Sequence, residues 1–131
     1  MDALAKDLWR RAQEALRVAR HDLSVSSDAA ASRAYYGAFY AVSAWFAVKG
    51  RTFRKHSMVE AAVHRDLVRP GIWPKELGAG FSRLAEARST ADYGETEHVS
   101  DEEAREAIRM AADIVQPVSQ ADPERFPAPQ D

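Results

Sequence analysis

The feature that most constrains this chain is a run of fifteen uncharged residues, from Ala34 to Val48, bounded by Arg33 and Lys49. The run is short for a membrane span, which takes about 20 apolar residues. A helix that is apolar on most of its sides has to be enclosed by other parts of the protein. We therefore expect the run to form the central helix of a bundle.

Helical signals lie on both sides of this run. Apolar residues recur at helical spacing between Leu4 and Leu23, which predicts a first amphipathic helix over about residues 2–23. The Ser26-Ser27-Asp28 sequence offers an N-cap for the central helix, and Gly50 suits its C-terminal end. No segment shows the alternation of a strand. We expect an all-α fold, an antiparallel bundle of about five helices.

The third helix is expected to follow a basic loop, residues 51–56. Ser57 and Glu60 match a capping box, which places the helix start at Ser57 and leaves His56 just outside it. The Pro70-Gly71 pair then ends the helix.

Two more helices complete the expected bundle. Pro74 suits the start of a fourth helix running to Tyr93, because a proline there loses no hydrogen bond. Ser100 and Glu103 form a second capping box, and the fifth helix is expected to end at Pro117. We predict one helical domain over residues 1–118 and a flexible, proline-rich tail over residues 119–131.

Composition excludes several classes of protein. The chain has no cysteine, which excludes disulfides, thiolate zinc sites and a cysteine nucleophile and favours a cytoplasmic location. The charged N-terminal segment does not resemble a signal peptide. His64 follows Glu60 by one helical turn, but two ligands alone are weak evidence for a metal. We expect no metal, no cofactor and no membrane association, and the sequence contains no P-loop, Rossmann glycine pattern, GxSxG elbow or HExxH motif.

Charge is unevenly distributed along the chain. Residues 49–69 hold six Lys/Arg and two acidic residues, whereas residues 92–103 hold six acidic residues and no Lys/Arg. The basic segment is suited to bind phosphate and the acidic segment to repel it. The alternative is that both segments are ordinary solvent-exposed faces without a ligand.

Arg88 interrupts an apolar stripe on the fourth helix. Asp92, one turn later, is placed to pair with it, and Tyr93 lies beside both. The cluster is either a structural clasp or the lining of a cleft that binds phosphate. On the central helix, Arg33, Tyr36 and Tyr40 share one face. Tyrosines at this spacing usually pack, so we expect this face to contact another helix or a second subunit in a homodimer.

Three motifs occur in a characteristic order: SRAYYGAF at residues 32–39, KHS at 55–57 and RSTADY at 88–93. Over about residues 5–118 the chain resembles the short bacterial and archaeal proteins of the HEPN superfamily. The resemblance implies a helical bundle that dimerises. Many family members are metal-independent ribonucleases, often toxins paired with a small nucleotidyltransferase antitoxin, and others are nucleotide-binding or structural partners.

The resemblance implies a component of a toxin–antitoxin or defence system that acts on RNA. Ribonuclease members carry a histidine four to six residues after the motif arginine, where this chain has Tyr93. A tyrosine titrates near pH 10 and is a poorer proton acceptor than imidazole. The alternative is therefore a non-catalytic nucleotide-binding or structural partner of a nucleotidyltransferase.

Candidate residues follow from the same motifs and from the basic loop. For metal-free RNA cleavage, His56, Tyr93 and Arg88 can serve as base, acid and phosphate-binding cation if they converge. The catalytic candidates are Arg88, Tyr93, His56 and Asp92. The candidates for binding RNA or a nucleotide are Arg33, Tyr36, Arg51, Arg54 and Lys55.

Overall fold

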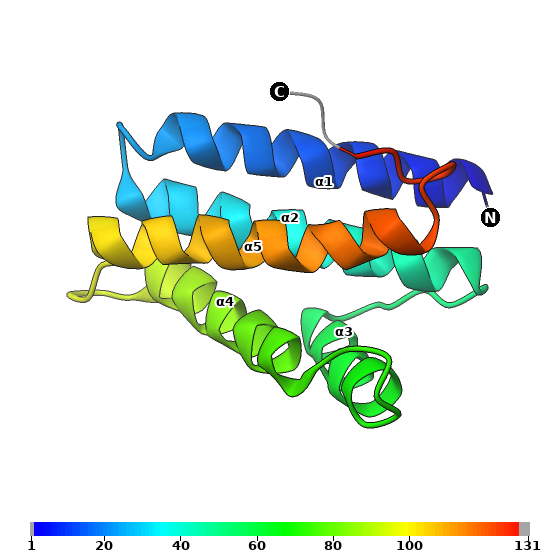
Figure 1. Ribbon diagram of the computed structural model, residues 1–131. Helices are drawn as coiled ribbons and strands as arrows, with labels where there is room; N and C mark the ends of the chain where they lie inside the picture. Colours follow the sequence, from blue (N-terminus) through cyan, green and yellow to red (C-terminus); the bar gives the residue numbers. More distant parts are fainter. Residues whose placement is uncertain (1, 129–131) are drawn as a thin grey trace.

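A computed structural model describes residues 2–128, and within them the chain is helical with no strand. The helices are α1 (Asp2–Asp22), α2 (Ser27–Val48), α3 (His56–Ala62), α4 (Lys75–Tyr93) and α5 (Asp101–Ala121). A π-helical segment, η1 (Val63–Val68), continues α3. The prediction of an all-α bundle of about five helices is confirmed. Figure 1 shows α1, α2 and α5 lying lengthwise beside one another. Helix α4 runs obliquely to these three, and α3 lies near the first residues of α4.

The uncharged run forms α2, which contacts α1, α4 and α5 and is the central helix, as predicted. Its enclosed faces are rich in alanine, so neighbouring helices approach closely. At Gly37 a Cβ atom would lie 2.9 Å from Leu16 Cγ, so this contact with α1 requires glycine. No helix in the described residues is long and apolar enough to cross a membrane.

Local capping signals set several helix ends. Ser26 caps α2 by accepting a hydrogen bond from the Ala29 amide at 3.1 Å. Gly50, at φ 78°, ends the same helix in a left-handed conformation that suits glycine. The predicted capping box of Ser100 and Glu103 is confirmed, with both hydrogen bonds at 3.0 Å.

The predicted capping box at Ser57 was wrong. The N-cap of α3 is Lys55, which makes no side-chain capping bond, and His56 is the first residue inside the helix. Glu60, expected to cap the helix start, instead accepts a hydrogen bond from Ser82 of α4 at 2.6 Å. A tertiary contact therefore takes the carboxylate that the local motif would have used.

The predicted end of the last helix at Pro117 was also wrong, because α5 continues to Ala121. A proline within a helix removes one backbone hydrogen bond. Here Asp113, whose carbonyl loses that bond, lies at the exposed surface, while Val118 and Ser119 are buried. Burial of the following turn holds the helix together beyond the proline.

The segment after α5 packs against α1, although the sequence predicted a flexible tail from residue 119. Phe126 is buried, with its ring centroid 5.2 Å from that of Trp9. Ser119 Oγ donates to the Phe126 carbonyl at 2.7 Å, and Trp9 Nε1 donates to the Pro127 carbonyl at 3.1 Å. The chain through Pro127 is thus attached to the helices, and residues 129–131 lie outside the described part.

Replacing Phe126 by alanine should lower the free energy of unfolding by about 3 kcal/mol, because it empties a buried aromatic site. Chemical denaturation of the parent and the variant measures the change. Glu124→Ala alters an exposed residue of the same segment and should leave the midpoint unchanged. Equal midpoints for Phe126→Ala and the parent would show that the segment does not pack on α1.

Candidate functional site

Arg88 lies in the last turns of α4, and its side chain is only 20% exposed. Nη2 donates to the Tyr36 hydroxyl at 3.1 Å and to the Tyr93 hydroxyl at 3.4 Å. Nε lies 3.1 Å from Asp92 Oδ2, so the predicted Arg88–Asp92 pair is confirmed. Among the described residues, however, no acceptor is aligned with the buried Nε–H, so we interpret the contact with Asp92 as an ion pair without a well-directed hydrogen bond.

Aromatic rings surround the guanidinium of Arg88. Its central carbon lies 5.3 Å from the ring centroid of Tyr93 and 5.6 Å from that of Tyr36. Arg33, on α2, also lies over the Tyr36 ring, at 4.7 Å. Cations within about 6 Å of an aromatic face are attracted to it. Tyr36 therefore connects two arginines from different helices.

His56 joins the same cluster from α3. Its ring centroid is 4.4 Å from Phe39 and 5.7 Å from Tyr36, so Tyr36 contacts both His56 and Arg88. Burial, and secondarily the charge of Arg88, lower the pKa of His56 below its usual range. The imidazole is consequently neutral at neutral pH and able to accept a proton.

The fold thus gathers six of the nine predicted site residues from three helices. Arg33 and Tyr36 come from α2, and His56 from α3. Arg88, Asp92 and Tyr93 come from α4. We call this set the Arg88 site. Tyr93 is its most accessible aromatic group, 68% exposed.

The other three predicted residues do not contact the Arg88 site. The Arg51 guanidinium lies 4.7 Å from the Phe46 ring centroid and pairs with Asp66 at 2.7 Å. Arg54 and Lys55 are exposed on the connection that leads into His56. They border the site along the chain and take no part in its hydrogen bonds.

Sequence reasoning missed a polar contact that attaches α3 and η1 to α4. Ser82 Oγ donates to Glu60 Oε2 at 2.6 Å and lies 2.9 Å from His64 Nε2. Because the single hydroxyl proton is given to the carboxylate, His64 Nε2 acts as a donor to Ser82. The spacing of His56, Glu60 and His64, four residues apart each time, was the available signal that they share one helix face.

Sequence analysis also missed the floor of the site. Tyr35 is buried, with its ring 5.8 Å from that of His56. Burial raises the pKa of the Tyr35 phenol, so it remains a neutral hydroxyl. No group of three or more metal-ligating side chains is found within residues 2–128.

Chemically, the Arg88 site combines a fixed guanidinium, a neutral imidazole and an exposed aromatic ring. A guanidinium suits phosphate oxygens, and an aromatic ring offers a stacking surface for a nucleobase. The carboxylate of Asp92 offsets the charge of Arg88 and so weakens the long-range electrostatic attraction of an anion. The same ion pair holds the Arg88 side chain in place.

Comparisons with known proteins concern the family and the fold. A HEPN domain model matches residues 5–121. A UPF0332 protein of Thermotoga maritima is 42% identical over 107 residues, which cover 80% of this chain and 81% of the relative. The crystal structure of TT1696 from Thermus thermophilus superposes with a TM-score of 0.73 at 21% identity, covering 88% of this chain and 96% of the other. This last likeness concerns the fold alone.

Replacing Asp92 by alanine should reduce stability by about 1–2 kcal/mol, between the values for exposed and buried ion pairs. The Arg88 side chain is mostly buried, but the Tyr36 and Tyr93 hydroxyls remain as partners. Thermal unfolding monitored by circular dichroism measures the effect. Glu106→Ala removes the partner of Arg109 in a well-exposed pair and is the matched control, expected to change nothing measurable. If Asp92→Ala behaves like this control, the clasp contributes nothing to stability.

Proposed function

Because this chain belongs to the HEPN domain family, we propose that its Arg88 site binds RNA and that the protein is a component of a toxin–antitoxin or defence system. The observation that carries the proposal is a chain of contacts: Tyr36 contacts both His56 and Arg88, and Arg88 in turn contacts Tyr93. These side chains offer a cation for phosphate, a proton acceptor and a surface for a base.

Binding of RNA rests on the exposed side of this cluster. The guanidinium keeps N–H donors beyond those given to Tyr36 and Tyr93, and it is fixed by Asp92. Tyr93 offers most of its ring to solvent. A phosphate on Arg88 and a base on Tyr93 therefore belong to one nucleotide of a single strand, the form of RNA whose bases are free to stack.

Cleavage without a metal would use the same residues. His56 is neutral and takes the proton of the 2′-hydroxyl, which then attacks the adjacent phosphate. Arg88 stabilises the charge of the phosphorane, and Tyr93 donates a hydrogen bond or a proton to the leaving oxygen. Asp92 orients Arg88 and need not touch the substrate.

A second function is favoured by one observation: Tyr36 contacts both His56 and Arg88, and within residues 2–128 no hydrogen bond joins those two side chains directly. If Tyr36 keeps these contacts when RNA binds, the imidazole of His56 and the guanidinium of Arg88 do not act on the same phosphate, and no cleavage follows. The protein would then hold a nucleotide, or act as the structural partner of a small nucleotidyltransferase. The catalytic and non-catalytic functions use the same Arg88 site and differ in the fate of the RNA.

The decisive experiment compares RNA binding and cleavage in EDTA by the parent and by Tyr93→Phe, Tyr93→His, His56→Ala and Arg88→Lys, with folding checked by circular dichroism. We expect Arg88→Lys to weaken binding about tenfold, because lysine lacks the guanidinium fork. If the protein is catalytic, His56→Ala and Tyr93→Phe lose cleavage while keeping the fold, and Tyr93→His retains or increases it.

Each outcome separates the two functions. Cleavage that survives His56→Ala, Tyr93→Phe and Arg88→Lys sinks the proposed site. RNA binding without cleavage by the parent, with or without a nucleotidyltransferase, favours the non-catalytic partner. No binding by the parent and no effect of Arg88→Lys would remove RNA as the ligand of the site.

The proposed assembly is a homodimer. Tyr36, Phe39 and Tyr40 form an aromatic stripe on α2 that the other helices cover only in part. A contiguous apolar surface of this kind marks an interaction site, and a second copy of the stripe matches it in chemistry. The Arg88 site would then lie at the edge of the interface, because Tyr36 belongs to both.

Light scattering at micromolar concentration should give twice the chain mass. Tyr40→Arg should shift the protein toward the monomer, because a guanidinium replaces part of the stripe. Val25→Arg changes a residue that is 76% exposed in the connection between α1 and α2, so it is the control and should remain dimeric. A monomeric parent refutes the dimer.

A further inference from the structure

A hollow that is distinct from the Arg88 site lies beside α3 and η1. It has a volume of about 410 Å³. Its wall is formed by the connection after α2 and by one face of α3 and η1, with Arg51, Thr52, Phe53, Met58, Ala61 and Arg65. The last three are spaced i, i+3 and i+7, whereas His56 and Glu60 occupy a different face. The hollow and the Arg88 site share no residue.

Two guanidiniums in this hollow are held by one carboxylate. Arg65 binds Asp66 through Nε and Nη2, each at 3.0 Å, and Arg51 Nη1 binds the same carboxylate at 2.7 Å. These hydrogen bonds, first from Arg65 and then from Arg51, lower the pKa of Asp66 to about 2. The carboxylate is therefore ionised at any physiological pH, and the three groups together carry one positive charge.

Both guanidiniums keep free donors. An arginine has five N–H groups, and the bonds to Asp66 use one nitrogen of Arg51 and two of Arg65. The side chains are 38% and 55% exposed, so the remaining N–H groups reach solvent. Arg51 also lies over the rings of Phe46 and Phe53, which restricts its motion. The pair is thus preorganised to bind an anion with little loss of side-chain entropy.

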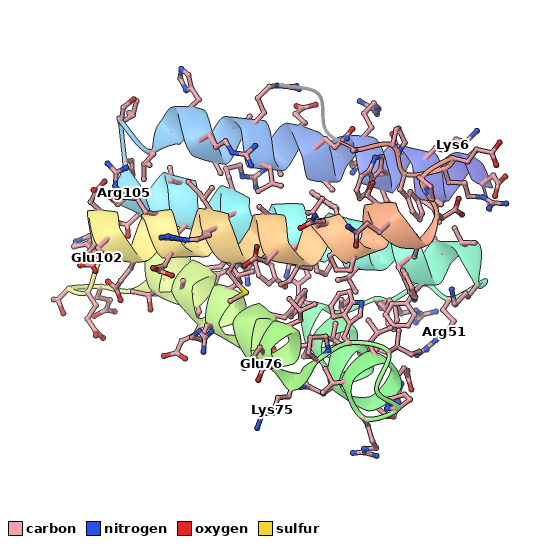
Figure 2. The ribbon with its side chains drawn as sticks, viewed as in Figure 1. Lys6, Arg51, Lys75, Glu76, Glu102 and Arg105 are labelled. Carbon is pink, nitrogen blue, oxygen red and sulfur yellow. The ribbon has the colours of Figure 1, made fainter. Side chains whose placement is uncertain are left out.

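The wall beside the arginines is apolar. Met58 is 47% exposed, and Phe53 is partly exposed at the edge of the hollow. An anion with an attached flat apolar group matches this combination, with phosphate on the arginines and a base against Phe53 and Met58. Figure 2 labels Arg51 and the acidic residue Glu102 toward opposite ends of the molecule, so the acidic start of α5 lies away from the hollow.

We propose that this Arg51–Arg65 hollow is a second nucleotide subsite for a single-stranded RNA bound at the Arg88 site, an inference that rests on the proposed function. The two sites are separated by the width of α3, about 10 Å. Arg54 and Lys55 are exposed on the connection between them and line the path of the strand. A short oligonucleotide fills one site, while a longer one fills both and gains affinity because the second contact is intramolecular.

The test compares a dinucleotide, which is too short to span the separation of the two sites, with a single-stranded RNA of about 12 nucleotides, a length within the range that such sites bind. Fluorescence anisotropy measures their affinities for the parent, Arg65→Gln and Arg109→Gln. Arg109 is an exposed arginine of α5 that pairs with Glu106, which makes it the matched control. We expect Arg65→Gln to lose about tenfold in affinity for the longer RNA and nothing for the shorter one. For this variant, the slope of the logarithm of the binding constant against the logarithm of salt concentration should decrease in magnitude by about 0.7, the value for the loss of one phosphate contact. The control should match the parent.

A second measurement separates this proposal from the function on which it rests. Titration with adenosine 5′-monophosphate, followed by backbone amide shifts in NMR, reports the two sites independently: residues 50–53, 58, 61 and 65 for the hollow and residues 88–93 for the Arg88 site. Shifts near the hollow that Arg65→Gln abolishes support the subsite even if the Arg88 site is silent. Shifts confined to residues 88–93, with equal RNA affinity of Arg65→Gln and Arg109→Gln, overturn the subsite and leave the proposed function standing. No shifts and no RNA binding overturn both.

Discussion

Burial of α2 is the constraint on which the rest of the structure depends. A helix with no charge over fifteen residues has to be covered, and α1, α4 and α5 provide the cover. Its small residues allow this at short range, as at Gly37, where a side chain would meet Leu16. The cover is incomplete along Tyr36, Phe39 and Tyr40. The site and the proposed dimer surface both occupy this remaining aromatic stripe.

The Arg88 cluster shows how one group serves both the fold and the site. A mostly buried guanidinium needs partners, and Tyr36, Tyr93 and Asp92 supply them from two helices. Those partners also fix the direction in which the cation is presented. Burial of His56 in the same cluster, and secondarily the charge of Arg88, lower the pKa of that imidazole. Packing and site chemistry therefore have one physical origin here.

The short α3 segment divides the functional surface. One face carries His56 toward the aromatic cluster and Glu60 toward Ser82, which attaches the segment to α4. The opposite face, which continues into η1, carries Arg65 toward Arg51 and Asp66. Because both faces belong to the continuous helical segment of α3 and η1, His56 and Arg65 are held at a fixed separation. A strand that touches both has to pass the N-terminal end of α3.

What the sequence by itself determined is local. Three predicted features were confirmed: the cap at Ser100, the end of α2 at Gly50 and the Arg88–Asp92 pair. Each depends on residues within about one helical turn of one another, where spacing along the chain decides contact. The number of helices was predicted from the same local signals. The family could also be inferred, because its three motifs lie in order along the chain.

Only the tertiary structure decided which distant groups meet. Ser82 takes Glu60 from its expected capping role, Phe126 returns to Trp9, and Tyr36 joins His56 to Arg88. The partners in these contacts are 20 to 117 residues apart, and their meeting depends on how whole helices cross. Helix crossing is set by the packing of many side chains at once, which no local spacing encodes. For this reason the helices could be predicted closely and the site only as a list of candidates.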